Sequence, residues 1–238
     1  MPSTLELELA LAGSAWSAST GRVSRHIDVY YDADGRLGMA GVALRHRRSS
    51  GGQRVTLKAD AGVTGAVPRE DAPGPTGVAT GALHARTELE VALPPLVPTA
   101  ATDLDSGAGN RVAWPAQVLA ALPAGVAEAD LAPVAELRIR RVAYLVAPAQ
   151  ADGGAPLVEL AFDEVTCVSP GAAADPTSAA VFHEVELEWL GDEDSSLAVV
   201  TATLAGIAEA VATVVQLTAS PVSKLHRALA LLSALNDD

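Results

Sequence analysis

The chain has 238 residues, of which 29 are Asp or Glu and 16 are Lys or Arg, so its formal net charge is −13. Apolar residues make up 49% of it, a composition typical of globular proteins with a sizeable core. The acidic balance disfavours binding to nucleic acid or to an anionic membrane, because their phosphate groups would be repelled. Aromatic residues are only 3% of the chain, which also disfavours a surface for stacking bases.

The N-terminus and the single cysteine indicate a cytoplasmic protein. Cys167 has no second cysteine with which to form an internal disulfide, which fits a reducing compartment. Glu6 and Glu8 lie where a signal peptide would be uniformly apolar. The most apolar stretch, residues 197–218, carries Glu209 near its middle. We therefore expect a buried helix there rather than a membrane span.

Short runs of alternating apolar and polar residues recur along the chain and predict β-strands. These runs cover residues 5–11, 26–32, 42–48, 54–60, 86–93, 136–146, 157–165 and 182–190. Turn residues separate several of them, so neighbouring strands are expected to be antiparallel. Helices are expected at residues 115–122, 197–217 and 223–235, and long loops at residues 62–80 and 94–110.

The polar faces of these strands carry charges of mostly one sign. Because side chains alternate along a strand, Glu6, Glu8 and Ala10 share one face, and so do Arg45 and Arg47. The other sets that share a face are Arg86, Glu88 and Glu90, then Arg138 and Arg140, and then Glu184, Glu186 and Glu188. Like charges side by side are mildly destabilising. The pattern fits a closed barrel with an acidic and a basic wall inside, or a sandwich with solvated charged faces.

The order of the charged motifs resembles that of the CYTH family, the triphosphate tunnel proteins. This family includes inorganic triphosphatases, thiamine triphosphatases and a class of adenylate cyclases. The matching motifs are E-x-E at residues 6–8, Y-Y-D at 30–32, G-x-x-L-R-x-R at 41–47, a strand that ends in Lys58, R-x-E at 86–88, R-x-R-R at 138–141, an acidic turn at 162–164, E-x-E-x-E at 184–188 and S-K-x-x-R at 223–227. The segments LRIRR, FDEVTC and SPVSKLHRAL are most similar to CYTH domains that are fused to a helical CHAD domain.

The resemblance implies an α+β fold with residues 1–238 as a single CYTH-like tunnel domain. Its core would be an antiparallel closed β-barrel of about eight strands, with helices packed outside. The implied reaction is metal-dependent hydrolysis of inorganic triphosphate or a related organic triphosphate, by in-line attack of water without a covalent intermediate. The implied cofactor is Mg²⁺ or Mn²⁺, and the implied ligand is a triphosphate or polyphosphate small molecule.

The resemblance also implies roles for individual charged residues. The metal would be held by Glu6, Glu8, Glu88, Asp163, Glu186 and Glu188. The phosphates would be bound by Arg45, Arg47, Lys58, Arg140 and Lys224. The implied catalytic residues are Glu6, Glu8, Arg45, Arg47, Lys58 and Arg140.

Ala10 departs from the family pattern, because the opening E-x-E-x-K motif has a lysine at this position. In the family this lysine lies beside the phosphates. Losing such a charge-assisted contact would cost ~3 kcal/mol or more of transition-state stabilisation. The alternative function is therefore a tunnel that binds polyphosphate or nucleotides without turning them over.

Two further expectations concern residues outside these motifs. The five histidines have no metal-ligand spacing, so packing or surface roles are expected for them. The predicted helix at residues 197–217 is apolar on nearly all sides, whereas a helix that covers a sheet needs one apolar stripe. The surplus face is expected to be buried in a homodimer or, alternatively, beneath the loop at residues 94–110.

Overall fold

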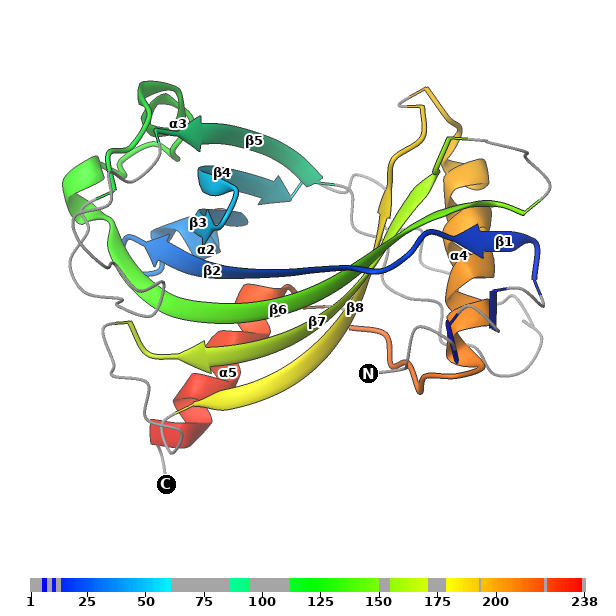
Figure 1. Cartoon of the computed structure of the whole chain (residues 1–238). Coiled ribbons are helices and arrows are strands. Elements are labelled where there is room, and N and C mark those ends of the chain that lie inside the picture. The colour runs from blue at the N-terminus through cyan, green and yellow to red at the C-terminus, as the bar shows by residue number, and fades with distance from the viewer. Residues whose placement is uncertain are drawn as a thin grey trace, which may run out of the picture.

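The computed structural model describes residues 6–7, 10–11, 14–60, 86–94, 112–149, 155–170, 179–192, 194–220 and 222–236. They form an α+β fold in which helices pack against one antiparallel eight-stranded sheet (Figure 1). The strands are β1 (Trp16–Ala18), β2 (Arg22–Asp32), β3 (Val42–Ser49), β4 (Gly52–Asp60), β5 (Arg86–Leu93), β6 (Ala132–Pro148), β7 (Val158–Val168) and β8 (Ala180–Trp189). The helices are α2 (Arg36–Met39), α3 (Ala116–Ala120), the 3-10 turn η1 (Glu128–Asp130), α4 (Leu197–Ala212) and α5 (Lys224–Asn236).

The sheet is open. Its strand order is β5-β4-β3-β2-β6-β7-β8, with β1 paired to β6. In the part of the chain that the structure describes, no pairing joins the end strands β5 and β8, so the expected closure into a barrel is not observed.

The N-terminal run that was expected to be a strand is helical at Glu6, Leu7, Ala10 and Leu11. Leu7 and Leu11 are 0% and 1% exposed. Residues four apart lie on one side of a helix, and the alternating leucines of this run contain that spacing as well as the strand period. The expectation of a strand here was therefore wrong at the residues described, and this segment does not extend the sheet.

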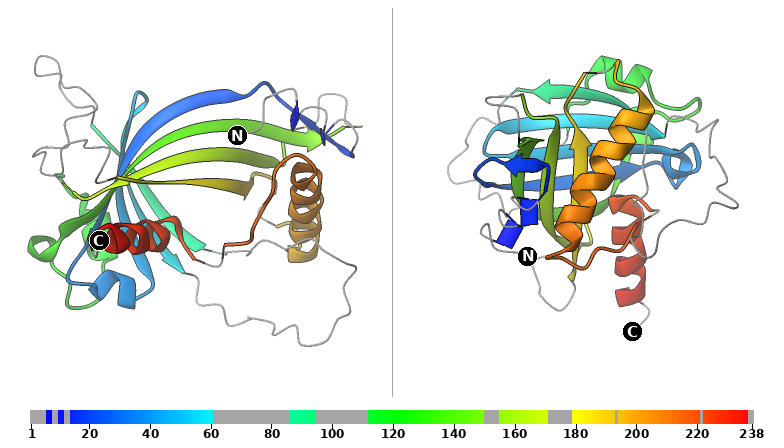
Figure 2. Two further views of the ribbon diagram at one scale, coloured as in Figure 1. Left: turned by 90° about the horizontal axis from the view of Figure 1, so that it is seen from below. Right: turned by 90° about the vertical axis from the view of Figure 1, so that its right-hand side faces the viewer.

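Three apolar clusters hold the helices on the sheet. α4 packs with Leu7 and Leu11 against β6 and β7, and α5 packs against β2, β6, β7 and β8. The third cluster joins α2 and α3 to β3, β4 and β5. Figure 2 shows α4 and α5 at opposite ends of the long strands. The three predicted helices are confirmed as α3, α4 and α5, while the predicted loops lie outside the described residues, except for Pro94.

α4 buries only part of its apolar surface. It begins after Ser196, whose hydroxyl accepts a hydrogen bond from the Val199 amide at 3.4 Å, as is typical of an N-cap. Ile207 and Val211 are fully buried, whereas Leu197 and Val199 are 69% and 54% exposed. The homodimer stays a prediction.

Among the residues that the structure describes, no helix is long and apolar enough to cross a bilayer.

Asp32 ends β2 by capping the turn into α2. Its Oδ1 accepts hydrogen bonds from the amides of Ala33 at 2.6 Å and Leu37 at 2.9 Å. Gly35 precedes α2 with a φ of 80°, a conformation that glycine adopts without strain. The last residue of the Y-Y-D motif therefore acts in shaping the turn that returns the chain into β3.

Candidate functional site

The strand register divides the charged side chains between the two faces of the sheet. Asp28 on β2 is aligned with Arg47 on β3 and with Leu137 on β6. Directly opposed residues of an antiparallel pair share a face. We call the face that carries Asp28 and the residues aligned with it the Asp28 face. The opposite face, which carries Ile27, is the Ile27 face.

Most of the site residues expected from the sequence lie on the Asp28 face. By strand alignment these are Arg45, Arg47, Lys58, Glu88, Asp163, Glu186 and Glu188. Lys224, the first residue of α5, reaches the same face through its contact with Asp163. The face therefore gathers basic and acidic groups from β3, β4, β5, β7, β8 and α5.

Two of the expected site residues, Arg140 and Glu6, do not lie on this face, and a third is not described. Arg140 is aligned with Arg25 on β2 and with Glu164 on β7, so it lies on the Ile27 face, and the next residue, Arg141, lies on the Asp28 face. Arg140 was expected to bind phosphate together with Arg45, but the alternation in β6 places it on the opposite face from Arg45. Glu6 is helical and exposed, and Glu8 lies outside the described residues.

Asp28 is the centre of a buried ion-pair network. Its carboxylate is 0% exposed and accepts two hydrogen bonds of 2.7 Å from Arg47 and one of 3.3 Å from Arg45. Burial alone would raise the pKa of Asp28, but the Arg47 hydrogen bond and the charges of Arg45 and Arg47 outweigh it and lower the pKa to about 2. Arg45 also donates to the Thr56 hydroxyl at 3.2 Å. The carboxylate thereby holds both guanidinium groups in fixed positions.

A second network surrounds Asp163, which is also 0% exposed. Arg141 donates to both of its oxygens at 2.8 Å, and Lys224 lies 2.6 Å from Oδ2. Both cations also contact Glu186, with the Lys224 contact at 3.1 Å. Burial would raise the pKa of Glu186, but Lys224 and Arg141 lower it to about 2.

Glu184 is the least compensated carboxylate of this second network. It lies 3.7 Å from Lys224, and its Oε2 is buried without a hydrogen-bond partner in the described part of the chain. Burial raises the pKa of Glu184, and Glu186 adds to the effect. An oxygen atom in this state is an acceptor available to a ligand.

His26 lies between the two networks. Its ring is 7% exposed, and Nε2 has no hydrogen-bond partner among the described residues. Burial lowers the pKa of His26 to about 4, and the charges of Asp28, Arg47, Arg141 and Asp163 also act on it. A neutral imidazole therefore occupies the gap between the two sets of cations. A packing or surface role was expected for this histidine, and its ring is buried.

The two ends of the sheet act on each other across the Asp28 face. Lys58 on β4 lies 3.0 Å from Glu88 on β5. The pKa of Glu188 on β8 is raised by burial and by Glu159, while Lys58 lowers it and Glu88 raises it. Charges at the β8 end therefore lie within electrostatic reach of those at the β4 and β5 end, although the strands are not paired.

The carboxylates of the Asp28 face do not converge on a cation site in the described residues, where no three Asp, Glu, His or Cys side chains are grouped to hold a metal. Carboxylate oxygens are the ligands that Mg²⁺ and Mn²⁺ prefer. In this arrangement, however, Arg141 and Lys224 contact Asp163 and Glu186. Two of the expected metal ligands, Asp163 and Glu186, are thus neutralised by side-chain cations.

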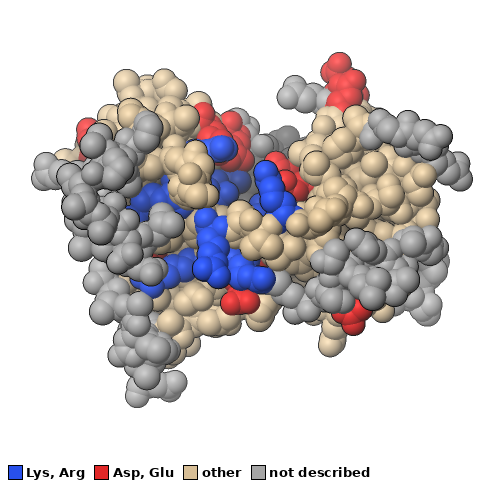
Figure 3. Space-filling view, in the orientation of Figure 1, with Lys and Arg blue, Asp and Glu red and all other residues tan. Residues whose placement is uncertain are grey.

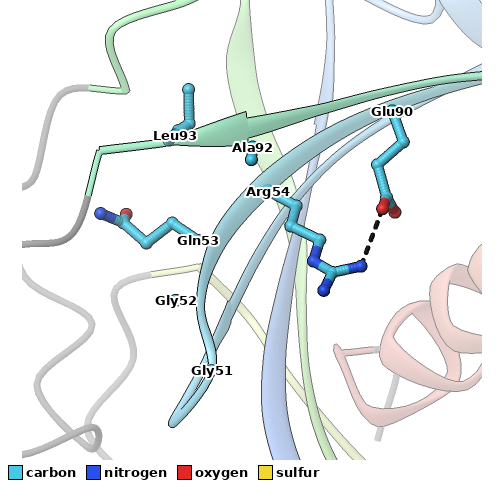
Figure 4. A pocket seen from close by; sticks show the side chains of 7 residues that line it. All are labelled: Gly51, Gly52, Gln53, Arg54, Glu90, Ala92 and Leu93. Carbon is cyan, nitrogen blue, oxygen red and sulfur yellow. Dashed lines mark hydrogen bonds and ion pairs between the residues drawn. The ribbon is translucent and has the colours of Figure 1, made fainter.

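A pocket of about 480 Å³ opens at the β3–β4 turn, where the Asp28 face ends (Figure 4). Its lining residues are Gly51, Gly52, Gln53, Arg54, Glu90, Ala92 and Leu93. Arg54 and Glu90 point toward each other and form an ion pair of 2.8 Å. Both are largely exposed, so the pocket is an open polar margin of the charged face rather than an enclosed cavity.

Sequence reasoning missed Asp28, His26 and Arg141 as residues of this site. A signal was present for the first two, because they precede Tyr30 by two and four residues and so share its face. Arg141 gave no comparable signal, since R-I-R-R contains arginines in both phases of the alternation.

Comparison with known proteins assigns the chain to a family. Among solved structures it is similar to the PH1819 protein from Pyrococcus horikoshii OT3, with 17% identity, a TM-score of 0.46 and coverage of 96% of this chain and 95% of that one. It is also similar to HpAC1 from Hippeastrum, a protein reported to have a dominant triphosphatase activity, with 16% identity, a TM-score of 0.49 and coverage of 98% and 92%. The search of curated proteins gave no match. The profile of the CYTH domain matches residues 2–216, and the chain belongs to the CYTH domain family.

Proposed function

We propose that the Asp28 face binds the phosphate chain of inorganic triphosphate or of a related organic triphosphate and hydrolyses it. The observation that carries this proposal is the gathering of cationic side chains on one face. Arg45 and Arg47 are held by Asp28, and Arg141 and Lys224 are held by Asp163. Lys58 adds a further cation near the ends of the sheet. Preformed cations of this kind stabilise the charge of a transferring phosphoryl group without reorganising.

The carboxylates in this proposal keep the cations in position until a ligand arrives. Phosphate oxygens would accept hydrogen bonds from the remaining N–H groups of these cations, while Asp28 and Asp163 keep the arginines oriented. His26 would contact the bound phosphate chain through its Nε2 atom. Water would attack the terminal phosphorus in line, forming one P–O bond as the anhydride P–O bond breaks. Glu188, whose pKa is raised by burial, is the carboxylate that we assign to orienting this water.

Dependence on a divalent cation is part of the proposal. Such a cation would neutralise phosphate oxygens when bound, and the acidic residues expected to hold it are Glu6, Glu8, Glu88, Asp163, Glu186 and Glu188. The described carboxylates do not form a cation site. The steps given above therefore use protein side chains and water alone. The greater similarity to those CYTH domains that are fused to a CHAD domain also stays a prediction.

A phosphate-release assay tests the hydrolase directly. Tripolyphosphate, thiamine triphosphate and ATP are each incubated with the chain in Mg²⁺, in Mn²⁺ and in EDTA. We expect phosphate release from at least one substrate, release that is lost in EDTA, and a fall of at least tenfold in Lys58→Gln. Arg36→Gln is the matched control, because Arg36 pairs with Asp130 beside α2, away from the Asp28 face. Absence of release from all three substrates would reject hydrolysis.

A second candidate function is binding without turnover, and two observations favour it. Ala10 stands where the family motif has a lysine, and Glu6 in the same motif is helical and exposed. Calorimetry that shows tripolyphosphate binding in a chain without hydrolysis would establish this alternative. Ala10→Lys then distinguishes the cause: if the missing lysine is the defect, turnover should rise by one to two orders of magnitude, about 1.4–2.8 kcal/mol of barrier.

A further inference from the structure

His26 is a buried base surrounded by charged groups on the Asp28 face. It lies on β2, which is placed between β3 and β6 in the sheet. The charges that act on its ring come from its own strand and from three others: Asp28 on β2, Arg47 on β3, Arg141 on β6 and Asp163 on β7. The ring therefore stands at the point where the two ion-pair networks approach each other.

The two carboxylates near His26 are already engaged by the arginines. Asp28 accepts two hydrogen bonds of 2.7 Å from Arg47, and Asp163 accepts two of 2.8 Å from Arg141. Neither aspartate is thus left to act as the ion-pair partner of a charged imidazole. Burial lowers the pKa of His26 to about 4, so the ring is neutral near pH 7 in the unliganded chain.

The Nε2 atom of His26 has no place for a second proton to bond. The ring is 7% exposed, and Nε2 is buried without a hydrogen-bond partner among the residues that the structure describes. A protonated ring would carry an N–H group at this atom with no acceptor, which costs free energy. A ligand oxygen at Nε2 would remove that cost.

The arginines on either side of His26 provide a route for such a ligand. Arg47 and Arg141 are both partly exposed, and their strands are the two neighbours of β2. Neighbouring strands lie ~4.8 Å apart, so the two arginines start about 10 Å from each other. On the face shown in Figure 3, Lys and Arg side chains lie together over the middle of the sheet. A chain of linked phosphates that contacts both arginines has to pass over His26.

A bound phosphate chain would reverse the balance of charge at the ring. One opposite charge within ~4–6 Å raises the pKa of a base by ~1–3, and a phosphate chain carries several negative charges. It also supplies the missing acceptor for Nε2. The imidazole is therefore more basic in the complex than in the free chain, and binding is linked to the uptake of a proton.

We infer that His26 takes up one proton from solvent when a phosphate chain binds to the Asp28 face, and that the imidazolium contacts the chain between Arg47 and Arg141. The inference rests on the binding step of the proposed function and not on hydrolysis. Because the negative charge of the ligand drives the uptake, His26 makes the face favour a longer phosphate chain over orthophosphate.

Nuclear magnetic resonance of the full chain labelled with ¹⁵N-histidine tests the inference directly. Spectra are recorded at pH 5.5, in EDTA and in Mg²⁺, without ligand and with saturating tripolyphosphate. The His26 signals are those lost in His26→Gln. We expect a neutral ring in the free chain, because pH 5.5 lies above its pKa of about 4, and a ring protonated on both nitrogens in the complex.

Calorimetry gives a second measurement of the same proton. The affinity of the unaltered chain for tripolyphosphate, divided by that of His26→Gln, should rise about tenfold as pH falls from 7.5 to 5.5, since only the unaltered chain gains a proton at this position. The ratio cancels the titration of tripolyphosphate itself. The matched control is His46→Gln, which alters a buried histidine on the Ile27 face whose Nε2 is paired with Gln53 at 2.9 Å. The corresponding ratio for this variant should not change with pH.

Each other result decides against a stated part. A neutral His26 ring in the saturated complex, or equal ratios for the two histidine variants, would overturn the inference and leave the proposed function standing. Absence of tripolyphosphate binding would reject both. A protonated ring without phosphate release would support the inference and reject hydrolysis. If His26→Gln does not fold, the spectra of the unaltered chain decide, with the His26 signals assigned by substituting the other four histidines in turn.

Discussion

The two faces of β2, β3 and β6 carry arginines in different electrostatic states. On the Asp28 face, Arg45 and Arg47 share one fully buried aspartate, and Arg141 lies against another. On the Ile27 face, Arg25 is aligned with Arg140, and the arginines outnumber the carboxylates. A guanidinium held by a buried carboxylate is positioned by it and contributes to stability. The two faces therefore surround the same residue type with different sets of charges.

Removing Asp28 should break the first face most severely. Asp28→Ala leaves Arg45 and Arg47 beside an apolar gap, and an uncompensated buried charge costs about 3–5 kcal/mol. We expect a loss of this size in the free energy of unfolding, measured by urea denaturation. The control is Glu90→Gln, which breaks the largely exposed pair with Arg54 on the same face and should cost less than about 1 kcal/mol. Similar losses in the two variants would contradict the difference between buried and exposed pairs.

His26 should make the stability of the first face depend on pH. Its pKa is about 4 in the folded chain and 6.5 in the unfolded one. Between these values the unfolded state binds more protons, so stability falls as pH is lowered from about 6.5 toward 4, by up to about 3 kcal/mol.

The variant His26→Gln should flatten this part of the pH profile, as measured by unfolding at pH 7 and pH 4.5. The carboxylate of Asp28, with a pKa lowered to about 2, should lose its contribution only as pH falls from about 4 toward 2. An unchanged slope in His26→Gln would show that another group titrates there.

The adjacent residues Arg140 and Arg141 compare the two faces at one point of the chain. Arg141→Gln removes two hydrogen bonds to the buried Asp163 and should cost about 2 kcal/mol, since hydrogen bonds to charged groups contribute ~1.5–3 kcal/mol each before Lys224 compensates. Arg140→Gln, with a side chain on the Ile27 face, should cost less. Thermal and urea unfolding of the two variants measure the difference. The reverse order would mean that the register of β6 is shifted by one residue.

The smallest expected effect has the opposite sign. Arg25→Gln removes a like-charge opposition with Arg140 and should raise the free energy of unfolding by about 0.2–1 kcal/mol in phosphate-free buffer. Arg22→Gln, aligned with Ala143, relieves no such opposition and should be close to neutral. A loss of stability in Arg25→Gln would show that this arginine makes a favourable contribution to the fold that outweighs the opposition.

Several features of the fold and of the site could be predicted from local sequence. The alternating runs correspond to β2–β8, and the three longer helical patterns correspond to α3, α4 and α5. Alternation also placed Arg45 with Arg47, because side chains two apart on a strand share a face whatever its neighbours are. The N-terminal run was misread, since Leu7 and Leu11 satisfy the strand period and the helix spacing at once.

What local sequence could not determine is the pairing between strands. Whether Arg140 or Arg141 faces Asp28 depends on the alignment of β6 with β2 and β7, and a shift of one residue would move every side chain to the other face. The buried state of Asp28 likewise depends on Arg45 and Arg47 arriving from another strand. The sequence by itself determined the strands, the helices and the charges that they carry, because these depend on residues close in the chain. Only the tertiary structure decided which charges meet, because that requires strands distant in the chain to be aligned.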